Sequence, residues 1–181
     1  MNDWREKLEY SLAAQQQFDF RILKDFIPNC VSVQKTDLAQ DKRGVDYIAT
    51  LEKGAEILID AKTRTADCAK YWKNDEPELA LEIWSVCETK IGWALSSSTN
   101  VDYILYTFDR SVCDRDYFLP FQLLRKAFRE NGRSWIDRYG AKYQYSNTWK
   151  SQAVFVPASV VVGAVSRCME GKALPPWPKW A

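Results

Sequence analysis

The sequence predicts an α/β fold in which a central mixed β-sheet is flanked by helices. Three runs of β-forming or alternating residues predict the sheet, over residues 44–50, 56–64 and 101–108. Amphipathic patterns at helical spacing surround these runs. The 181 residues fit one domain with a sizeable core. We expect a single domain over residues 1–171, followed by a Pro- and Trp-rich tail over residues 172–181.

The chain is expected to open with a long or kinked helix. Asp3 and Glu6 have the spacing of a capping box, and Trp4 begins an apolar repeat at helical spacing. The amphipathic pattern continues over residues 18–27 and stops at Pro28-Asn29. A short strand is then expected over residues 31–34, followed by a polar loop.

Two strands joined by a tight turn are expected next. Lys53-Gly54 supplies the turn between the runs at 44–50 and 56–64. Residues 63–78 are polar and interrupted by a proline, which predicts a surface loop. Alternation over residues 81–86 and high β-propensity over 101–108 then add two strands to the sheet.

Helices and one further strand are expected in the last third of the chain. Pro120 can open a helix that ends at Asn131-Gly132, and a second short helix is expected over residues 134–139. Residues 153–156 predict a strand. Residues 159–168 are ambiguous by periodicity, and we favour a helix there.

Composition excludes several classes of protein. No histidine occurs, which removes Ser-His-Asp and Cys-His catalytic systems and histidine-ligated zinc. The seven glycines match neither a dinucleotide-binding nor a P-loop pattern. Five cysteines without zinc-ligand spacing are expected to be reduced and mostly buried. The net charge is +1, and no apolar run approaches the ~18 residues of a membrane span, so we expect a soluble, cytoplasmic protein.

One group of residues in the predicted hairpin could carry chemistry. Asp60 and Lys62 share a face of their strand, and the hairpin would bring Asp46 beside Asp60. Two adjacent carboxylates either share a proton or bind a cation, and oxygen ligands favour Mg²⁺ or Mn²⁺. Lys62 could orient a water and stabilise charge on a phosphate, as phosphodiester hydrolysis requires. Alternatively, the aspartates end their strands in solvent and Lys62 makes an exposed ion pair worth little.

The residues Gly44-Val45-Asp46 and Asp60-Ala61-Lys62 resemble the signature of the PD-(D/E)XK nuclease superfamily, which has the restriction-endonuclease-like fold. The resemblance covers residues 31–64. It implies that Asp46 and Asp60 are the two catalytic acids and that Lys62 is the catalytic lysine. It also implies Mg²⁺ or Mn²⁺ held by both acids and the Ala61 carbonyl, and DNA as the substrate.

Two features depart from the signature. Val45 stands where the signature has proline, and the second acid is Asp rather than Glu, both variants that the superfamily tolerates. Many members also carry an acid on the first helix, and the candidates for that position here are Glu9, Gln17 and Asp19.

A basic and aromatic stretch follows between residues 121 and 150, with seven basic residues against two acids. It predicts a nucleic-acid surface, although for any single residue a solvated helix face or an ordinary core aromatic is the better explanation. The residues we expect to contact nucleic acid are Lys42, Arg43, Arg64 and Lys150. Glu82 either points at the metal site or makes a cross-strand charge pair.

The sequence therefore predicts a Mg²⁺-dependent nuclease whose partner is DNA and not a membrane. A homodimer is also possible. The alternative is a catalytically inactive module of the same fold that binds nucleic acid or protein, such as a phage or mobile-element accessory protein. A third explanation is an interaction protein that uses the Trp-rich tail as an arm. Metal binding separates the first from the other two.

Overall fold

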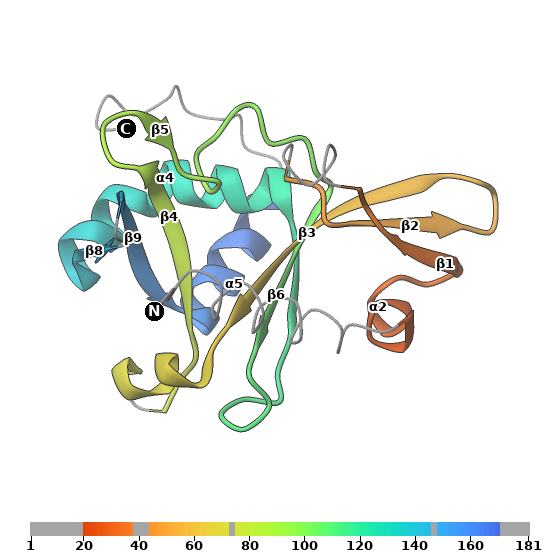
Figure 1. Cartoon of the computed structure of the whole chain (residues 1–181), viewed down its shortest axis with the longest axis horizontal. Helices are drawn as coiled ribbons and strands as arrows, with labels where there is room; N and C mark the ends of the chain where they lie inside the picture. Colours follow the sequence, from red (N-terminus) through yellow and green to blue (C-terminus); the bar gives the residue numbers. More distant parts are fainter. Residues whose placement is uncertain (1–19, 38–43, 73–74, 146–147, 171–181) are drawn as a thin grey trace. The chain divides into compact units, whose positions relative to one another are not determined.

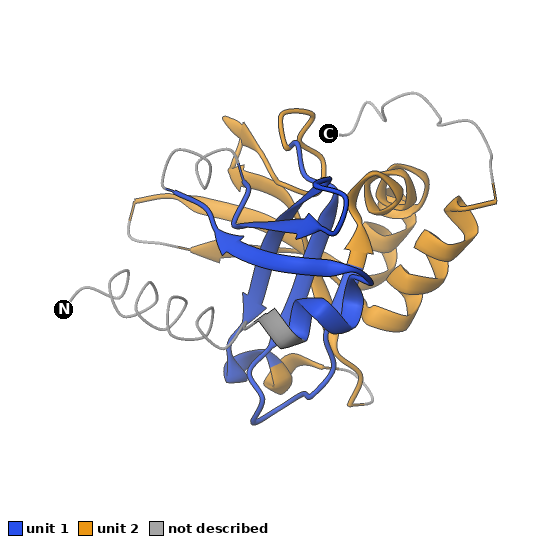
Figure 2. Ribbon diagram, turned by 90° about the vertical axis from the view of Figure 1, so that its right-hand side faces the viewer, with its two compact units in different colours: residues 1–68, 100–118 blue, residues 69–99, 119–181 orange. Residues whose placement is uncertain are grey.

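The computed structural model describes residues 20–37, 44–72, 75–145 and 148–170. The chain divides into two compact units, Met1–Cys68 with Asn100–Phe118 (unit 1) and Ala69–Thr99 with Leu119–Ala181 (unit 2), coloured separately in Figure 2. The fold is α/β, with one mixed sheet and one antiparallel sheet. The expected class and mixed sheet are confirmed, but two sheets replace the single sheet expected. The single domain over 1–171 stays a prediction.

The five-stranded mixed sheet has the order β1-β2-β3-β6-β7. β1 pairs antiparallel with β2 and β2 with β3, whereas β3 and β6 run parallel. The first four strands belong to unit 1, and β7 begins there and ends in unit 2. Figure 1 labels the strands, whose bounds are β1 Cys30–Lys35, β2 Tyr47–Leu51, β3 Glu56–Arg64, β6 Tyr103–Phe108 and β7 Tyr117–Pro120.

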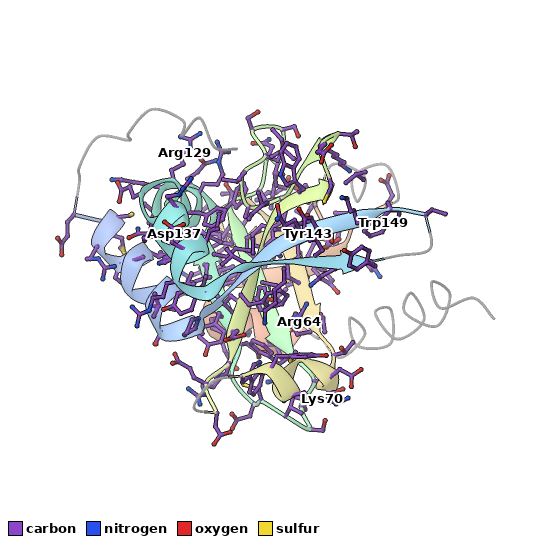
Figure 3. All side chains as sticks on the ribbon, turned by 90° about the vertical axis from the view of Figure 1, so that its left-hand side faces the viewer. Arg64, Lys70, Arg129, Asp137, Tyr143 and Trp149 are labelled. Carbon is purple, nitrogen blue, oxygen red and sulfur yellow. The ribbon has the colours of Figure 1, made fainter. Side chains whose placement is uncertain are left out.

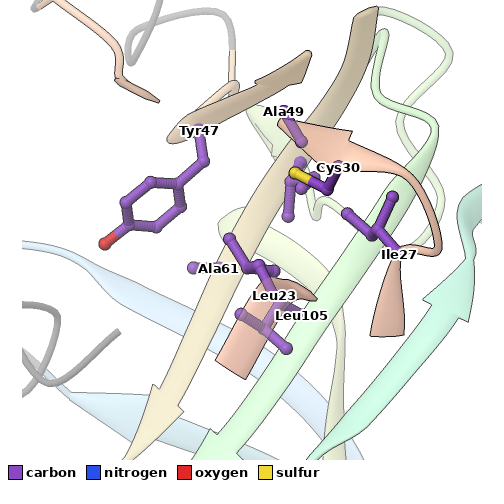
Figure 4. Close-up of a cluster of buried hydrophobic side chains, with 8 residues drawn as sticks. Leu23, Ile27, Cys30, Tyr47, Ala49, Ala61 and Leu105 are labelled. Atoms are coloured by element: carbon purple, nitrogen blue, oxygen red, sulfur yellow. The ribbon is translucent and has the colours of Figure 1, made fainter. Parts of the chain in front are cut away.

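The core of unit 1 lies between one face of this sheet and helix α2 (Phe20–Phe26) with the turn that follows it. Leu23 and Ile27 pack against side chains from three neighbouring strands, among them Ala49, Ile59 and Leu105 (Figure 4). Burying Leu23 fully contributes about 1.5–3 kcal/mol. Because side chains alternate along a strand, the residues between these apolar positions project from the opposite face of the sheet.

The turn between β2 and β3 forms where the sequence predicts it. Gly54 has a φ of +79°, a conformation that glycine adopts at little cost. The Gly54 amide donates to the Leu51 carbonyl at 2.8 Å, and the Leu51 amide donates to the Ala55 carbonyl at 2.8 Å. This tight closure sets the register of the two strands.

Unit 2 contains an antiparallel sheet with the order β5-β4-β9-β8. The strands expected at 81–86 and 153–156 exist, but they pair with each other in this second sheet. The helix favoured over residues 159–168 is also confirmed. The bounds are β4 Glu78–Val86, β5 Lys90–Ile91, β8 Ala141–Tyr145, β9 Lys150–Pro157, α4 Phe121–Tyr139 and α5 Ala158–Cys168. The loop expected over 63–78 contains a 3-10 helix, η1 (Ala66–Tyr71), which the sequence did not predict.

Helix α4 corrects the prediction of two separate helices. The helix continues through Asn131-Gly132, and the Asn131 side-chain amide donates to the Ala127 carbonyl at 2.8 Å. Gly132 is buried, and Trp135 beyond it stacks on Phe128 with ring centroids 5.9 Å apart. The apolar face therefore extends past the glycine, which packing retains inside the helix.

Some expectations concern residues outside the described ranges, and others can be compared with the structure directly. The helix expected from residue 4 and the tail over 172–181 lie outside the described residues. All five cysteines are free, and four of them are buried, as expected. No helix within the described ranges is both long and apolar enough to span a bilayer.

Candidate active site

The β2–β3 hairpin brings the two predicted acids together. Tyr47 pairs with Ile59 at the start of β2, and Asp46 is the residue before it. The Asp46 amide also donates to the Ile59 carbonyl, at 2.9 Å, so the pairing is irregular at this point. The Asp46 carboxyl interacts with the Asp60 carboxyl both through charge and through a side-chain hydrogen bond. The two carboxylates therefore share the face opposite α2.

Hydrogen bonds from two directions hold Asp46 in place. Its Oδ2 accepts a hydrogen bond from the Ala61 amide at 2.7 Å. Its carbonyl accepts from the Thr36 amide at 3.0 Å and from the Thr36 hydroxyl at 3.1 Å, and the same hydroxyl donates to the Val45 carbonyl. Gly44 enters this turn with a φ of 81°, and the Val45 side chain is buried. Both the side chain and the backbone of Asp46 are thus fixed.

The electrostatics of Asp46 reflect its carboxylate neighbour. Burial raises the pKa of Asp46, and so do repulsion by Asp60 and a side-chain hydrogen bond with it. The Ala61 amide and the Lys62 charge lower this pKa without cancelling the rise. The pair therefore favours a proton or a cation between the two carboxylates, as adjacent carboxylates do.

Asp60 and Lys62 form an ion pair on the same face of β3. Lys62 Nζ lies 2.5 Å from Asp60 Oδ1. The Asp60 side chain is only 3% exposed, while that of Lys62 is 30% exposed. The interpretation of this pair as a solvent-exposed contact at the strand ends is therefore wrong for Asp60. The ammonium is placed between a buried carboxylate and the exterior.

Arg64 lies on the same face of β3 as Asp60 and Lys62, and its guanidinium interacts with Cys68. Its charge and a side-chain hydrogen bond lower the pKa of the Cys68 thiol, although burial raises that pKa more. Arg64 is half-buried. Contact between Arg64 and nucleic acid stays a prediction.

The other predicted residues either lie outside the described residues or belong to unit 2. Lys42 and Arg43 lie outside the described residues, as do the three helix candidates Glu9, Gln17 and Asp19. Lys150 is an exposed residue of unit 2. Glu82 also belongs to unit 2, where its Oε2 accepts from the Ser85 hydroxyl at 2.5 Å and from the Trp93 amide at 3.4 Å. These local contacts replace the cross-strand charge pair considered for Glu82.

Two residues of the site escaped prediction from the sequence. Thr36 fixes the backbone of Asp46, yet nothing in the polar run around it marks one threonine. Tyr47 is 5% exposed, and burial together with the Asp46 charge raises its pKa to about 12. Its position next to Asp46 in an alternating strand was the available signal.

The donor atoms at the hairpin suit a hard divalent cation. Two carboxylates meet next to the Ala61 peptide group, and oxygen ligands of this kind favour Mg²⁺ or Mn²⁺. Across the part of the chain that the structure describes, no cluster of three or more His, Cys, Asp or Glu side chains could hold a metal. The available set is therefore two carboxylates and backbone carbonyl oxygen.

Comparisons with known proteins give no further guidance on this site. No family model, no curated protein and no solved structure matches the chain. The site must be interpreted from its own residues, which are two facing carboxylates and a lysine on one hairpin.

Proposed function

We propose that the β2–β3 hairpin carries the active site of a metal-dependent nuclease that hydrolyses phosphodiester bonds in DNA. One observation carries this proposal: the carboxyls of Asp46 and Asp60 lie next to each other, and the Lys62 ammonium contacts Asp60. Helix α2 and strand β1 precede the hairpin, in the order on which the resemblance to PD-(D/E)XK nucleases rests. The restriction-endonuclease-like fold is part of the same proposal.

In this proposal, the Asp46 and Asp60 carboxylates and the Ala61 carbonyl hold Mg²⁺ or Mn²⁺. A bound ion of this kind supplies Lewis-acid chemistry, which promotes ionisation of water and neutralises charge on a phosphate. The raised pKa of Asp46 means that a proton and a cation compete for the same carboxylate pair. Lowering the pH should therefore weaken cation binding.

Lys62 contributes a positive charge to the same place. Its ammonium lies on a side chain that is 30% exposed, so it can reach a phosphate oxygen while Asp60 holds its position. A fixed ammonium stabilises negative charge that develops on the phosphate during attack. The Ala61 amide and Thr36 act as positioning groups, because their hydrogen bonds orient the side chain and the backbone of Asp46.

A nuclease assay with Mg²⁺ or Mn²⁺ on single-stranded, duplex and branched DNA tests the proposal. We expect cutting that disappears with EDTA, and losses of at least about 100-fold in Asp60→Asn and Lys62→Met. Lys53→Met is the matched control, because Lys53 is an exposed lysine in the turn of the same hairpin. The proposal fails if no substrate is cut, or if Asp60→Asn cuts as fast as the parent.

Calorimetry separates this function from a catalytically inactive module that binds nucleic acid or protein. Titration with Mn²⁺ should give a binding isotherm for the parent and none for Asp46→Ala. The inactive module would instead show no difference between these two proteins in the Mn²⁺ titration.

A further inference from the structure

The basic and aromatic stretch of unit 2 consists of two parts with different environments. In α4, Lys126 is only 7% exposed and donates to the Cys168 carbonyl at 3.3 Å, while Trp135 is buried against Phe128. In Figure 3, Arg129 and Asp137 mark this helix, Tyr143 marks β8, and Trp149 marks the residue just before β9. Packing in the core accounts for much of the helical part. The exposed aromatic and basic residues on and beside the strands remain to be explained.

Three aromatic rings stand exposed on or beside β8, the edge strand of its sheet. Tyr143 is 49% exposed, Tyr145 75% and Trp149 46%. Tyr143 and Tyr145 are two residues apart and therefore project from one face, with ring centroids 6.3 Å apart. Exposed aromatic rings that lie next to one another mark this strand as a candidate interaction surface.

One cation lies against these rings, and the neighbouring sequence contains no acid. Lys150 Nζ lies 5.0 Å from the centroid of the Tyr143 ring, on the same face by register, since Lys150 pairs with Tyr145. Lys142 projects from the opposite face of β8, where its Nζ lies 5.4 Å from the Phe155 ring centroid. The sequence contains no Asp or Glu between Asp137 and Glu170. A ligand that fits this surface is negatively charged and also offers flat apolar faces.

We propose that Tyr143, Tyr145, Trp149 and Lys150 form a binding surface for single-stranded nucleic acid. Unpaired bases stack on the exposed rings, and the Lys150 ammonium contacts a phosphate. A duplex fits poorly, because each of its bases is already stacked on both faces. This inference takes the class of ligand from the proposed nuclease function, but it concerns binding in unit 2 and needs no chemistry at the hairpin.

Fluorescence anisotropy with a labelled fifteen-nucleotide thymidine strand tests the surface. The titrations use the full chain carrying Asp60→Asn, in EDTA, so that neither cutting nor metal contributes. We expect Tyr145→Ala to weaken binding about tenfold and Tyr145→Phe to bind like its parent, because the ring rather than the hydroxyl makes the contact. An abasic strand of equal length and a fifteen-base-pair duplex should both bind at least about tenfold more weakly.

The phosphate contact has its own matched control. Lys150→Gln should weaken binding and reduce the slope of log affinity against log salt by about 0.7. Lys90→Gln removes the same charge from an exposed lysine on β5, at the other edge of the same sheet, and should leave binding nearly unchanged. A ribouridine strand that binds equally well supports the proposal, because stacking does not require deoxyribose.

Three results would overturn the inference: duplex or abasic DNA that binds as tightly as the thymidine strand, Tyr145→Ala that binds like its parent, or equal effects of Lys150→Gln and Lys90→Gln. Circular dichroism of each variant shows whether it is folded, and the comparison of Lys150→Gln with Lys90→Gln still tests the surface if the alanine variant is not. Failure of the nuclease proposal is visible separately, as absence of cutting while strand binding persists.

Discussion

Replacing Lys62 by methionine should destabilise the folded protein, because it leaves the Asp60 carboxylate buried without its lysine. The Asp60 side chain is 3% exposed and its oxygen lies 2.5 Å from the lysine nitrogen. Removing one partner of a fully buried pair costs roughly 3–5 kcal/mol. Because the Lys62 side chain is 30% exposed, solvent screens part of the interaction, and we expect about 2–4 kcal/mol.

A double-mutant cycle isolates this interaction from the loss of lysine packing. Asp60→Asn with Lys62→Met removes both charges, so the cost of the double variant should fall below the sum of the single costs by at least about 1 kcal/mol. Urea unfolding in EDTA measures each free energy of unfolding by linear extrapolation. Lys53→Met, in the exposed turn, should change it by less than about 0.5 kcal/mol.

Additive costs would refute the reasoning. If the two single variants and the double variant agree within about 0.5 kcal/mol of additivity, Asp60 and Lys62 are not coupled. The pair would then stabilise neither charge, and Lys62 would lack the fixed position that the proposed function requires. The cycle thus tests the site geometry even before a substrate is known.

Further outcomes follow from the same structure. Asp46→Asn should raise the free energy of unfolding in EDTA at neutral pH. Because the pKa of Asp46 is raised in the folded state, the parent loses stability as the pH rises above the ordinary aspartate range, and the variant does not. The urea midpoints of the parent and the variant should therefore converge below that range. Tyr47 should ionise at about pH 12, which ultraviolet absorbance measures. The parent should lose stability as the pH rises from about 10 to about 12, and Tyr47→Phe should not show this loss. Gly92→Ala should destabilise by at least about 2 kcal/mol in thermal unfolding, because its Cβ would lie 2.3 Å from the Glu82 carbonyl oxygen. Gly163→Ala is its control: the nearest atom is the end of a flexible arginine at 3.5 Å, and alanine in a helix should stabilise by up to about 1 kcal/mol.

Local patterns in the sequence were sufficient for the hairpin. Alternation of apolar residues identified β2 and β3, and Gly54 identified the turn. Together they were enough to place Asp46 beside Asp60, because a tight turn leaves little freedom of register. Neither the burial of Asp60 nor the support from Thr36 was visible, since both depend on contacts between segments distant in sequence.

Non-local pairing accounts for most of what the sequence did not predict. β4 has the alternation of a strand but nothing that specifies β9 as its partner, so a single sheet was expected where two form. β8 has an almost wholly exposed side-chain pattern and exists because its backbone pairs with β9. Gly132 predicted a helix end, but the continuing apolar face overrode its propensity.

β3 serves the core and the candidate site at once, and its register connects the two. Ile59 and Ala61 project into the core of unit 1, while Asp60 and Lys62 project from the other face. A slip of one residue would exchange the two faces and place carboxylates against α2, at a cost far greater than any turn could offset. The apolar residues of β3 therefore fix the positions of the charged ones. It follows that substitutions at Asp60 or Lys62 change charge within a fixed register, so that cutting lost by a variant that is still folded can be assigned to the site rather than to a displaced strand.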